Sequence, residues 1–218
     1  MKQYYLPLIF VFSLGFAQQK PKFGITLGAT YSNIRGNEAA DKNKYDFNFL
    51  IGGSIEVPLN TKFSFLGNIN YERKTFKNSS AFNAYYLPSN FDPVFYANQQ
   101  AELKLTIQYL TVPLNLKYYL DAQKKFFVNG GPFLGLFLNS SSTINGSDTN
   151  EKSNNLFTAL DFGANFGIGS YFKISEKYAL NLELRHNYGL VNISNVPVVN
   201  NGSVKTNSFN LIANWQFN

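Results

Sequence analysis

The chain alternates apolar and polar residues with a period of two over most of its length. In the segment FGITLGATYSN, residues 23–33, every second side chain from Phe23 to Tyr31 is apolar, and glycine, serine or threonine stands between them. Successive side chains of a strand point to opposite faces, so the pattern predicts β-strands with one apolar face. It predicts eight of them, near residues 23–33, 45–57, 63–73, 103–119, 125–138, 156–173, 178–190 and 207–217.

The links between these segments alternate in length. Short links cover 58–62, 120–124 and 174–177, and long polar links cover 34–44, 75–101, 139–155 and 192–205. An up-and-down meander with tight turns at one end produces this order, and barrels of the bacterial outer membrane have short periplasmic turns and longer external loops. A closed barrel is also the β form that satisfies every backbone group within lipid. We therefore predict an all-β fold, an eight-stranded antiparallel up-and-down transmembrane β-barrel in the cell outer membrane.

The first 17 residues have the features of a secretory signal. Lys2 supplies the positive charge, Tyr4 to Phe16 is apolar, and Gly15-Phe16-Ala17 offers small residues for cleavage after Ala17. An apolar run of this length is too short for a membrane-spanning helix. The prediction is a signal peptide at 1–17 and a barrel domain at 18–218; the alternative is a buried amino-terminal strand or helix.

Composition favours lipid over water outside the barrel. Charged residues make up 15% of the chain and aromatic residues 17%, so the outer face carries less charge than a soluble barrel of the lipocalin type needs. The net charge is +6, but the 19 basic residues form no dense run, so we expect no nucleic-acid partner. There is no cysteine, which excludes disulfides and thiolate metal sites, and no cofactor is expected.

Aromatic residues gather near the predicted strand ends, as in the interfacial girdles of membrane barrels. The expected periplasmic girdle comprises Phe23, Phe63, Phe65, Tyr118, Phe126, Phe172, Tyr178, Trp215 and Phe217. The expected outer girdle comprises Tyr31, Tyr45, Phe47, Tyr71, Tyr109, Phe157, Tyr188 and Phe209.

The predicted strand at 103–119 contains a proline at its centre. Apolar residues hold the odd positions of 103–109 and then the even positions of 110–114. This change of phase predicts a β-bulge, which inserts one residue and tolerates proline, with Pro113 just below it and facing the lumen. About ten residues cross the apolar band, so a strand of this length is expected to project beyond the membrane on the outer side.

Three segments resemble the PorT-like outer-membrane β-barrel family of Bacteroidota. They are YLTVPLNLKYYL at 109–120, FFVNGGPFLGLFL at 126–138 and DFGANFGIGSYFKI at 161–174, and the likeness covers nearly all of the predicted barrel domain. The most specific elements are Tyr109, Leu110, Pro113, Leu114, Lys117 and Tyr118, followed by the pattern Asp161, Gly163, Gly167 and Gly169. The resemblance implies a small outer-membrane barrel; one member of the family is linked to assembly of a gliding and secretion apparatus.

Catalytic motifs are weak in this sequence. His186 is the only histidine, and its strand phase puts it on the lipid side near the outer girdle, so we expect an interfacial polar residue. A role like that of a barrel lipid-A hydrolase would need an acid–base partner that the sequence does not identify. The run DFGANFG lacks the strand-to-helix context of a phosphate-binding loop, and lumenal glycines that relieve crowding explain it better. We expect no catalytic residue and no metal site.

The inward phase collects charged residues. An eight-stranded barrel has an interior just wide enough to be filled by side chains, so we expect these groups to pair and to plug the lumen, with Arg185 a counter-ion of Asp161 or Glu183. A proton or ion path along them is the alternative. The predicted lumenal charge cluster is Asp46, Glu56, Glu72, Lys104, Lys117, Asp161, Glu183 and Arg185.

The long link at 75–101 is the candidate contact site. Exposed aromatic clusters commonly mark contact surfaces, although these could also pack on one another over the barrel mouth. Arg73, Lys74 and Lys77 at its base are expected to pair with lipopolysaccharide phosphates. The hypothesis is a monomeric, non-catalytic barrel whose partners are outer-membrane lipids, lipopolysaccharide and an unidentified envelope protein; a narrow channel and a lipid-modifying enzyme are the alternatives. The candidate contact residues are Phe82, Tyr85, Tyr86, Phe91, Phe95 and Tyr96.

Overall fold

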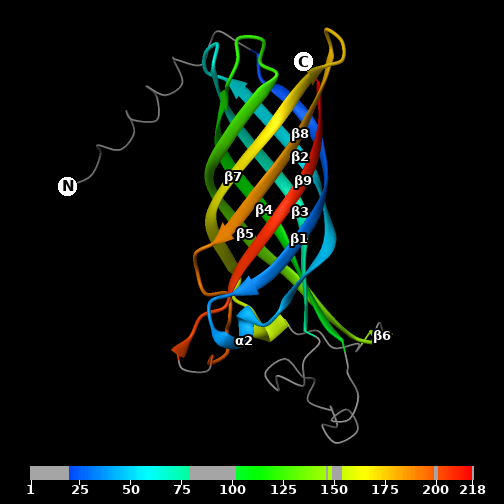
Figure 1. Ribbon diagram of the computed structural model, residues 1–218, viewed down its shortest axis with the longest axis vertical. Coiled ribbons are helices and arrows are strands. Elements are labelled where there is room, and N and C mark those ends of the chain that lie inside the picture. Colours follow the sequence, from blue (N-terminus) through cyan, green and yellow to red (C-terminus); the bar gives the residue numbers. More distant parts are fainter. Residues whose placement is uncertain (1–19, 79–101, 146, 149–153, 199–200, 218) are drawn as a thin grey trace, which may run out of the picture.

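The computed structural model describes residues 20–78, 102–145, 147–148, 154–198 and 201–217. In this part of the chain, eight long strands form a closed antiparallel barrel, which confirms the predicted fold (Figure 1). The barrel strands are β1 (Lys22–Arg35), β2 (Lys44–Pro58), β3 (Phe63–Asn78), β4 (Leu103–Tyr119), β5 (Phe126–Ile144), β7 (Leu160–Lys173), β8 (Tyr178–Gly189) and β9 (Lys205–Phe217).

Each barrel strand pairs with its neighbour in the chain, and pairing of β1 with β9 closes the barrel. The first residues of the chain, including the predicted signal peptide at 1–17, lie outside the described residues, so that prediction is untested. Among the residues that the structure describes, no helix has both the length and the hydropathy to cross a membrane.

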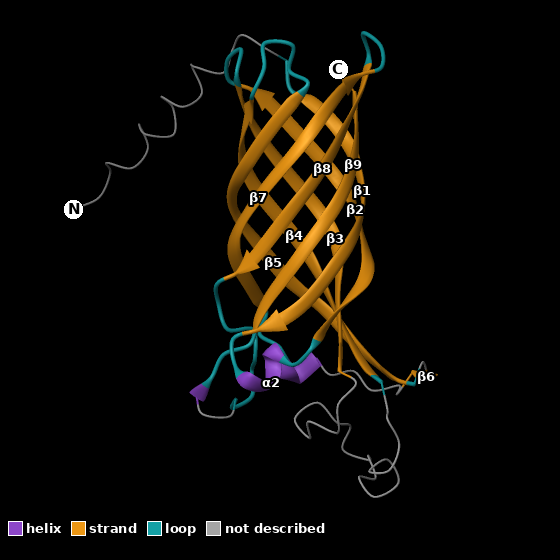
Figure 2. Cartoon of the chain, viewed as in Figure 1, coloured by secondary structure: helices purple, strands orange, loops and turns teal. Residues whose placement is uncertain are grey.

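The two ends of the barrel differ as predicted. The upper end in Figure 1 carries the short links 59–62, 120–125 and 174–177, and the strand ends that the long links join lie at the lower end (Figures 1 and 2). The lower end also holds three short elements that the alternation did not predict, because none is long enough to show a period. They are the helix α2 (Glu38–Asp41), the two-residue strand β6 (Ser147–Asp148) and the 3₁₀ helix η2 (Asn154–Leu156).

The outer face of the barrel is apolar along its whole girth. Phe47 and Leu211, for example, are 68% and 62% exposed, and the residues that alternate with them face the lumen. An exposed apolar band of this extent is the surface of a barrel that stands in lipid. Two residues assigned to the outer girdle are exceptions: Tyr109 faces inward and is fully buried, and Phe157 is buried under the lower end of the barrel.

The side-chain phase of β4 does not change, which corrects the sequence prediction. The odd residues face inward from Leu105 to Tyr119, so Leu105 is a core residue. The bulge lies in β5, where Leu138 has no partner because Gln108 pairs with Asn139 and Tyr109 with Phe137. The odd residues from 103 to 109 are apolar because they face an apolar interior at the outer end of the barrel. In the sequence they could not be distinguished from residues that face lipid.

Pro113 faces the lumen, as predicted, and interrupts one of its two ladders. Its pairing with Phe133 of β5 is intact, whereas the β3–β4 pairing skips Val112 and Pro113 and then resumes in the same register. A proline has no N–H to donate to the ladder, so the strand keeps its register at the cost of one local gap.

Glycines of β7 make room for aromatic rings in the lumen. A Cβ at Gly163 would lie 2.5 Å from the Phe133 ring, and a Cβ at Gly169 would lie 2.4 Å from the Phe127 ring. Neither position could hold a side chain without moving its neighbour, since real Cβ atoms do not approach so closely. This agrees with the interpretation of DFGANFG as a packing motif.

Candidate functional site

A layer of polar side chains closes the lumen near the short turns, and Lys117 is at its centre. Its Nζ lies 2.9 Å from Glu56 Oε2 and donates to Asn181 Oδ1 at 3.0 Å. The second oxygen of Glu56 accepts from the Tyr119 hydroxyl at 2.7 Å, and Gln216 donates to Glu56 Oε2 at 2.8 Å. All of these groups are buried, and each charge has several hydrogen-bond partners, which a charge needs in a dry interior.

A second ion pair lies one layer further along the lumen. Arg185 meets Glu183 with two contacts, Nε to Oε1 at 2.6 Å and Nη2 to Oε2 at 3.0 Å. Arg185 Nη1 also donates to Asn68 Oδ1 across the barrel at 3.4 Å. The pair belongs to one strand, with Arg185 two residues after Glu183 on the inward face of β8. Of the two counter-ions considered for Arg185, the structure selects Glu183.

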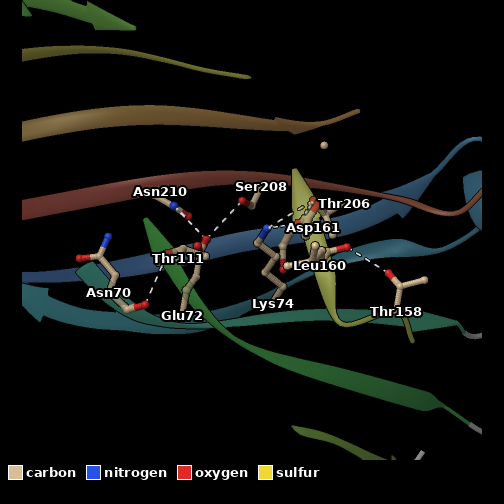
Figure 3. A network of polar contacts seen from close by, with 12 residues as sticks. Asn70, Glu72, Lys74, Thr111, Thr158, Leu160, Asp161, Thr206, Ser208 and Asn210 are labelled. Carbon is tan, nitrogen blue, oxygen red and sulfur yellow. Dashed lines mark hydrogen bonds and ion pairs between the residues drawn. The ribbon is translucent and has the colours of Figure 1, made fainter. Parts of the chain in front are cut away.

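The third charged layer contains Lys74, Asp161 and Glu72 (Figure 3). Lys74 Nζ lies 3.0 Å from Asp161 Oδ2, which also accepts from the Thr206 hydroxyl at 2.7 Å. Glu72 Oε1 accepts from Asn210 at 3.0 Å and, more weakly, from Ser208 at 3.4 Å. The layer therefore joins β3, β7 and β9 through the lumen.

Lys74 was missed as a lumenal residue. The sequence analysis placed it with Arg73 and Lys77 at the loop base, but it is 2% exposed and its ammonium lies 5.1 Å from the Tyr109 ring centroid. The strand phase contained the signal, since Asn70, Glu72 and Lys74 share one face of β3. Lys74 therefore cannot reach lipopolysaccharide.

The charged groups in these layers fill the barrel instead of lining a channel. The cavity that Glu56, Asn68, Lys117 and Arg185 help to line has a volume of about 10 Å³, about the space that one water molecule needs. The described side chains around this cavity are therefore closely packed. Among the residues that the structure describes, seven charged ones are buried: Glu56, Glu72, Lys74, Lys117, Asp161, Glu183 and Arg185.

An apolar cluster, here called the outer cap, closes the lumen at its other end. It joins inward residues of β1, β3 and β4 to α2 and to the segments before β7 and β9, and Phe137, Leu156, Val191 and Val198 pack against it. Burying apolar surface contributes about 25 cal/mol per Å² to stability, so this cluster stabilises the bases of several links against the barrel. The outer cap consists of Ile34, Ala40, Phe76, Leu105, Ile107, Tyr109, Phe157, Ile193 and Val204.

The outer rim carries a network of four exposed or half-buried charges. Lys104 Nζ lies 3.2 Å from Asp46 and 3.3 Å from Glu102, and Lys77 Nζ lies 3.8 Å from Asp46 and 3.9 Å from Glu102. The prediction that Lys104 belongs to the lumenal charge cluster is therefore wrong, and Asp46, which is inward in phase and pairs with Ser32, lies at the rim apart from the buried charges. Both side chains are partly exposed, so solvent reaches their ion pair.

His186 faces outward and has no catalytic partner among its recorded contacts. Its ring stacks on Phe209 at 4.3 Å, and Nε2 lies 2.7 Å from Asn207 Oδ1. Asn207 also donates to Asn33 at 3.1 Å, so the histidine belongs to a small polar cluster on the outer face. Within the described ranges, no three metal-ligating side chains are grouped closely enough to hold a metal ion.

The candidate contact residues all lie in the segment 79–101, which is outside the described residues. The structure gives the two ends of that segment: β3 ends at Asn78 and β4 begins at Leu103, and these residues pair with each other. The hypothesis of a contact surface there stays a prediction.

A closed eight-stranded barrel with an apolar outer surface and a filled polar lumen defines the class of membrane-spanning β-barrels. The chain belongs to the family of outer membrane protein beta-barrel domains, whose model matches residues 16–195. The protein is thus located in the cell outer membrane. The match identifies this family but not the PorT-like branch within it.

Solved structures with a similar fold include three outer-membrane proteins. Neisserial surface protein A is 18% identical, with 91% of this chain and 99% of that chain covered and a TM-score of 0.47. For Ail of Yersinia pestis the identity is 12%, the coverages are 91% and 100%, and the TM-score is 0.43. For OprG of Pseudomonas aeruginosa the identity is 15%, the coverages are 91% and 96%, and the TM-score is 0.41. No curated protein matches this chain in sequence.

Proposed function

We propose that the protein is a non-catalytic outer-membrane barrel that presents its long external links to an envelope protein or an extracellular ligand. The observation that carries this proposal is the outer cap. An apolar core beyond the membrane holds α2 and the links before β7 and β9 in fixed positions, which makes a rigid base for contact residues.

The filled lumen supports the same proposal. A conduit for solutes needs a polar path wider than a solute, whereas here two buried ion pairs join different strands through the lumen and the outer cap lies beyond them. The surroundings of His186 also favour a non-catalytic role, because its contacts are an aromatic ring and an amide.

We further propose that the chain belongs to the PorT-like branch of barrels and contributes to envelope assembly or secretion. Support comes from the roles of the residues that carry the resemblance: Pro113 and Lys117 face the lumen at a ladder gap and an ion pair, and Leu114 faces lipid. Residues with such specific structural roles are those that the members of a family are expected to share.

The test is photo-cross-linking in intact cells with a cross-linker in place of Phe82. We expect it to capture a specific protein or glycan, and we expect the double substitution Tyr85→Ser with Tyr86→Ser to abolish capture without altering heat-modifiable gel mobility. A cross-linker at Ser147, an exposed residue of β6, is the control and is expected to capture no such partner.

Three results would contradict the proposal. Equal capture at both positions would mean that contact at Phe82 is nonspecific. Discrete conductance steps of the purified protein in planar bilayers would support a channel instead. A change in lipid A mass between cells with and without the protein would support an enzyme.

A further inference from the structure

The positive charge of the described chain is concentrated at the short-turn end of the barrel. Seven lysines lie there with only two carboxylates, Asp121 and Glu176, whereas the lumen and the outer end hold nearly balanced charges. By the general orientation of such barrels this end faces the periplasm. The lysines are Lys20, Lys22, Lys62, Lys124, Lys125, Lys173 and Lys177.

Four of these lysines line a cavity in the barrel rim. Its volume is about 870 Å³, and it lies between the link 120–125 and the end of β7. These two segments are joined directly, since Tyr171 N donates to Lys125 O at 2.8 Å. The cavity is therefore a feature of paired strands and not of one mobile turn. Its lining includes Lys22, Lys124, Lys125, Lys173, Phe126 and Phe172.

The cavity keeps an excess of positive charge. Asp121 is engaged by the backbone of its own turn, accepting from Phe126 N at 2.9 Å and Lys125 N at 3.1 Å. Glu176 forms an exposed ion pair with Lys173 at 2.6 Å. Within the described ranges, Lys22, Lys124 and Lys125 are in no ion pair, and Lys22 and Lys124 lie over the rings of Tyr171 and Tyr119. An anion entering the cavity meets cations that no carboxylate has neutralised.

The lining also crosses from the lumenal side of the rim to the lipid side. Phe126 and Phe172 point outward and are 55% and 46% exposed, and each adjoins a lysine in the chain, Lys125 or Lys173. Aromatic side chains at this level mark the boundary between headgroups and acyl chains. The cavity thus offers cations to a headgroup and aromatic rings to the upper part of an acyl chain.

We propose that this cavity binds an anionic glycerophospholipid of the periplasmic leaflet. Its phosphodiester lies among Lys22, Lys124 and Lys125, the lining lysines without an ion pair in the described part of the chain, and its first acyl methylenes lie along Phe126 and Phe172. Clusters of basic residues beside a membrane-spanning segment bind anionic lipid by this combination of charge and position. The site is separate from the external links, so a result that contradicts their proposed role would leave this proposal unaffected.

The test measures lipid retention by native mass spectrometry, on protein released from nanodiscs containing equal parts of dioleoyl phosphatidylglycerol and dioleoyl phosphatidylcholine. We expect wild type to retain phosphatidylglycerol selectively. The triple variant Lys22→Gln, Lys124→Gln, Lys125→Gln is expected to lose affinity roughly 100-fold, since each lysine near an anionic surface contributes on the order of a fivefold factor.

The matched control removes the same charge at the same end but outside the cavity, as Lys20→Gln, Lys62→Gln, Lys177→Gln. It should retain the lipid nearly as wild type does, and both variants should keep heat-modifiable mobility as proof of folding. Equal losses in both variants would mean general attraction to charge and would overturn the site. Selective retention by the cavity variant, equal retention of phosphatidylcholine, or displacement by inorganic phosphate alone would overturn it as well.

Discussion

The buried pair of Arg185 and Glu183 allows a sharp test of whether the lumen is dry. Arg185→Ala removes a cation that is 2% exposed and leaves the Glu183 carboxylate, 5% exposed, with no counter-ion within hydrogen-bond distance. Breaking a buried ion pair by removing one partner costs about 3–5 kcal/mol, because the remaining charge stays desolvated. We expect Arg185→Ala to lower the free energy of unfolding by that amount.

The assay is reversible urea unfolding in lipid vesicles, followed by the fluorescence of Trp215, the single tryptophan of the chain. Glu183→Gln combined with Arg185→Ala should recover much of the loss, because no uncompensated charge remains in the lumen. Lys173→Ala, which breaks the exposed pair with Glu176, is the control and should cost less than about 1 kcal/mol. A loss this small for Arg185→Ala would show that water enters the lumen and would refute the argument for a plugged barrel.

Three other perturbations test separate parts of the structure. Gly169→Ala should lower the free energy of unfolding by about 1–3 kcal/mol, because its Cβ would overlap the Phe127 ring. Adding Phe127→Leu to the same chain should recover part of this loss. If the losses of the two substitutions add instead, the packing argument is contradicted. The pKa of Asp121 is lowered below its ordinary value of 3.8 by backbone N–H groups of its own turn, above all by that of Phe126. The ionised carboxylate therefore stabilises the fold above pH 3.8, and this stabilisation is lost as the pH falls through the depressed pKa. Chemical unfolding at a series of pH values should show this loss in wild type and not in Asp121→Asn, and parallel curves would refute it. A cysteine at Ser147 should react with an impermeant maleimide in intact cells while one at Asn60 does not, and the reverse would mean that the barrel is inverted.

The strands and their two faces could be predicted from sequence because the two environments differ so strongly. Lipid selects apolar residues and the lumen selects polar ones, so a period of two is plain from Phe23 to Tyr31. The same rule failed at Leu105 and Tyr109, because the inward residues at the outer end of β4 are apolar and contribute to the outer cap, whereas the outward residues Lys104, Thr106 and Gln108 are polar. Alternation alone cannot tell a lipid face from a core face.

The charged residues of the lumen were largely found, but of their ion-pair partners only Glu183 for Arg185 was among those considered. Strand phase gives the direction of a side chain and could have identified Lys74 as inward, had its nearness to the long link not suggested a surface role. Which carboxylate each cation meets depends on the stagger of strands that are distant in sequence, such as β3 and β7 for Lys74 and Asp161. A single sequence contains no direct signal of that stagger.

The closure of the barrel by β1 and β9 has a consequence for how the chain folds. These strands are paired over 13 residue pairs, from Phe23 with Phe217 to Arg35 with Lys205, although nearly the whole chain separates them. Until β9 is in place, β1 presents an open edge of the kind that templates aggregation. Contacts of such long sequence separation form late and slowly, since the entropy of closing the loop is lost before the pairs can form. Before closure the chain therefore exposes unpaired strand edges, and the completed ring removes them.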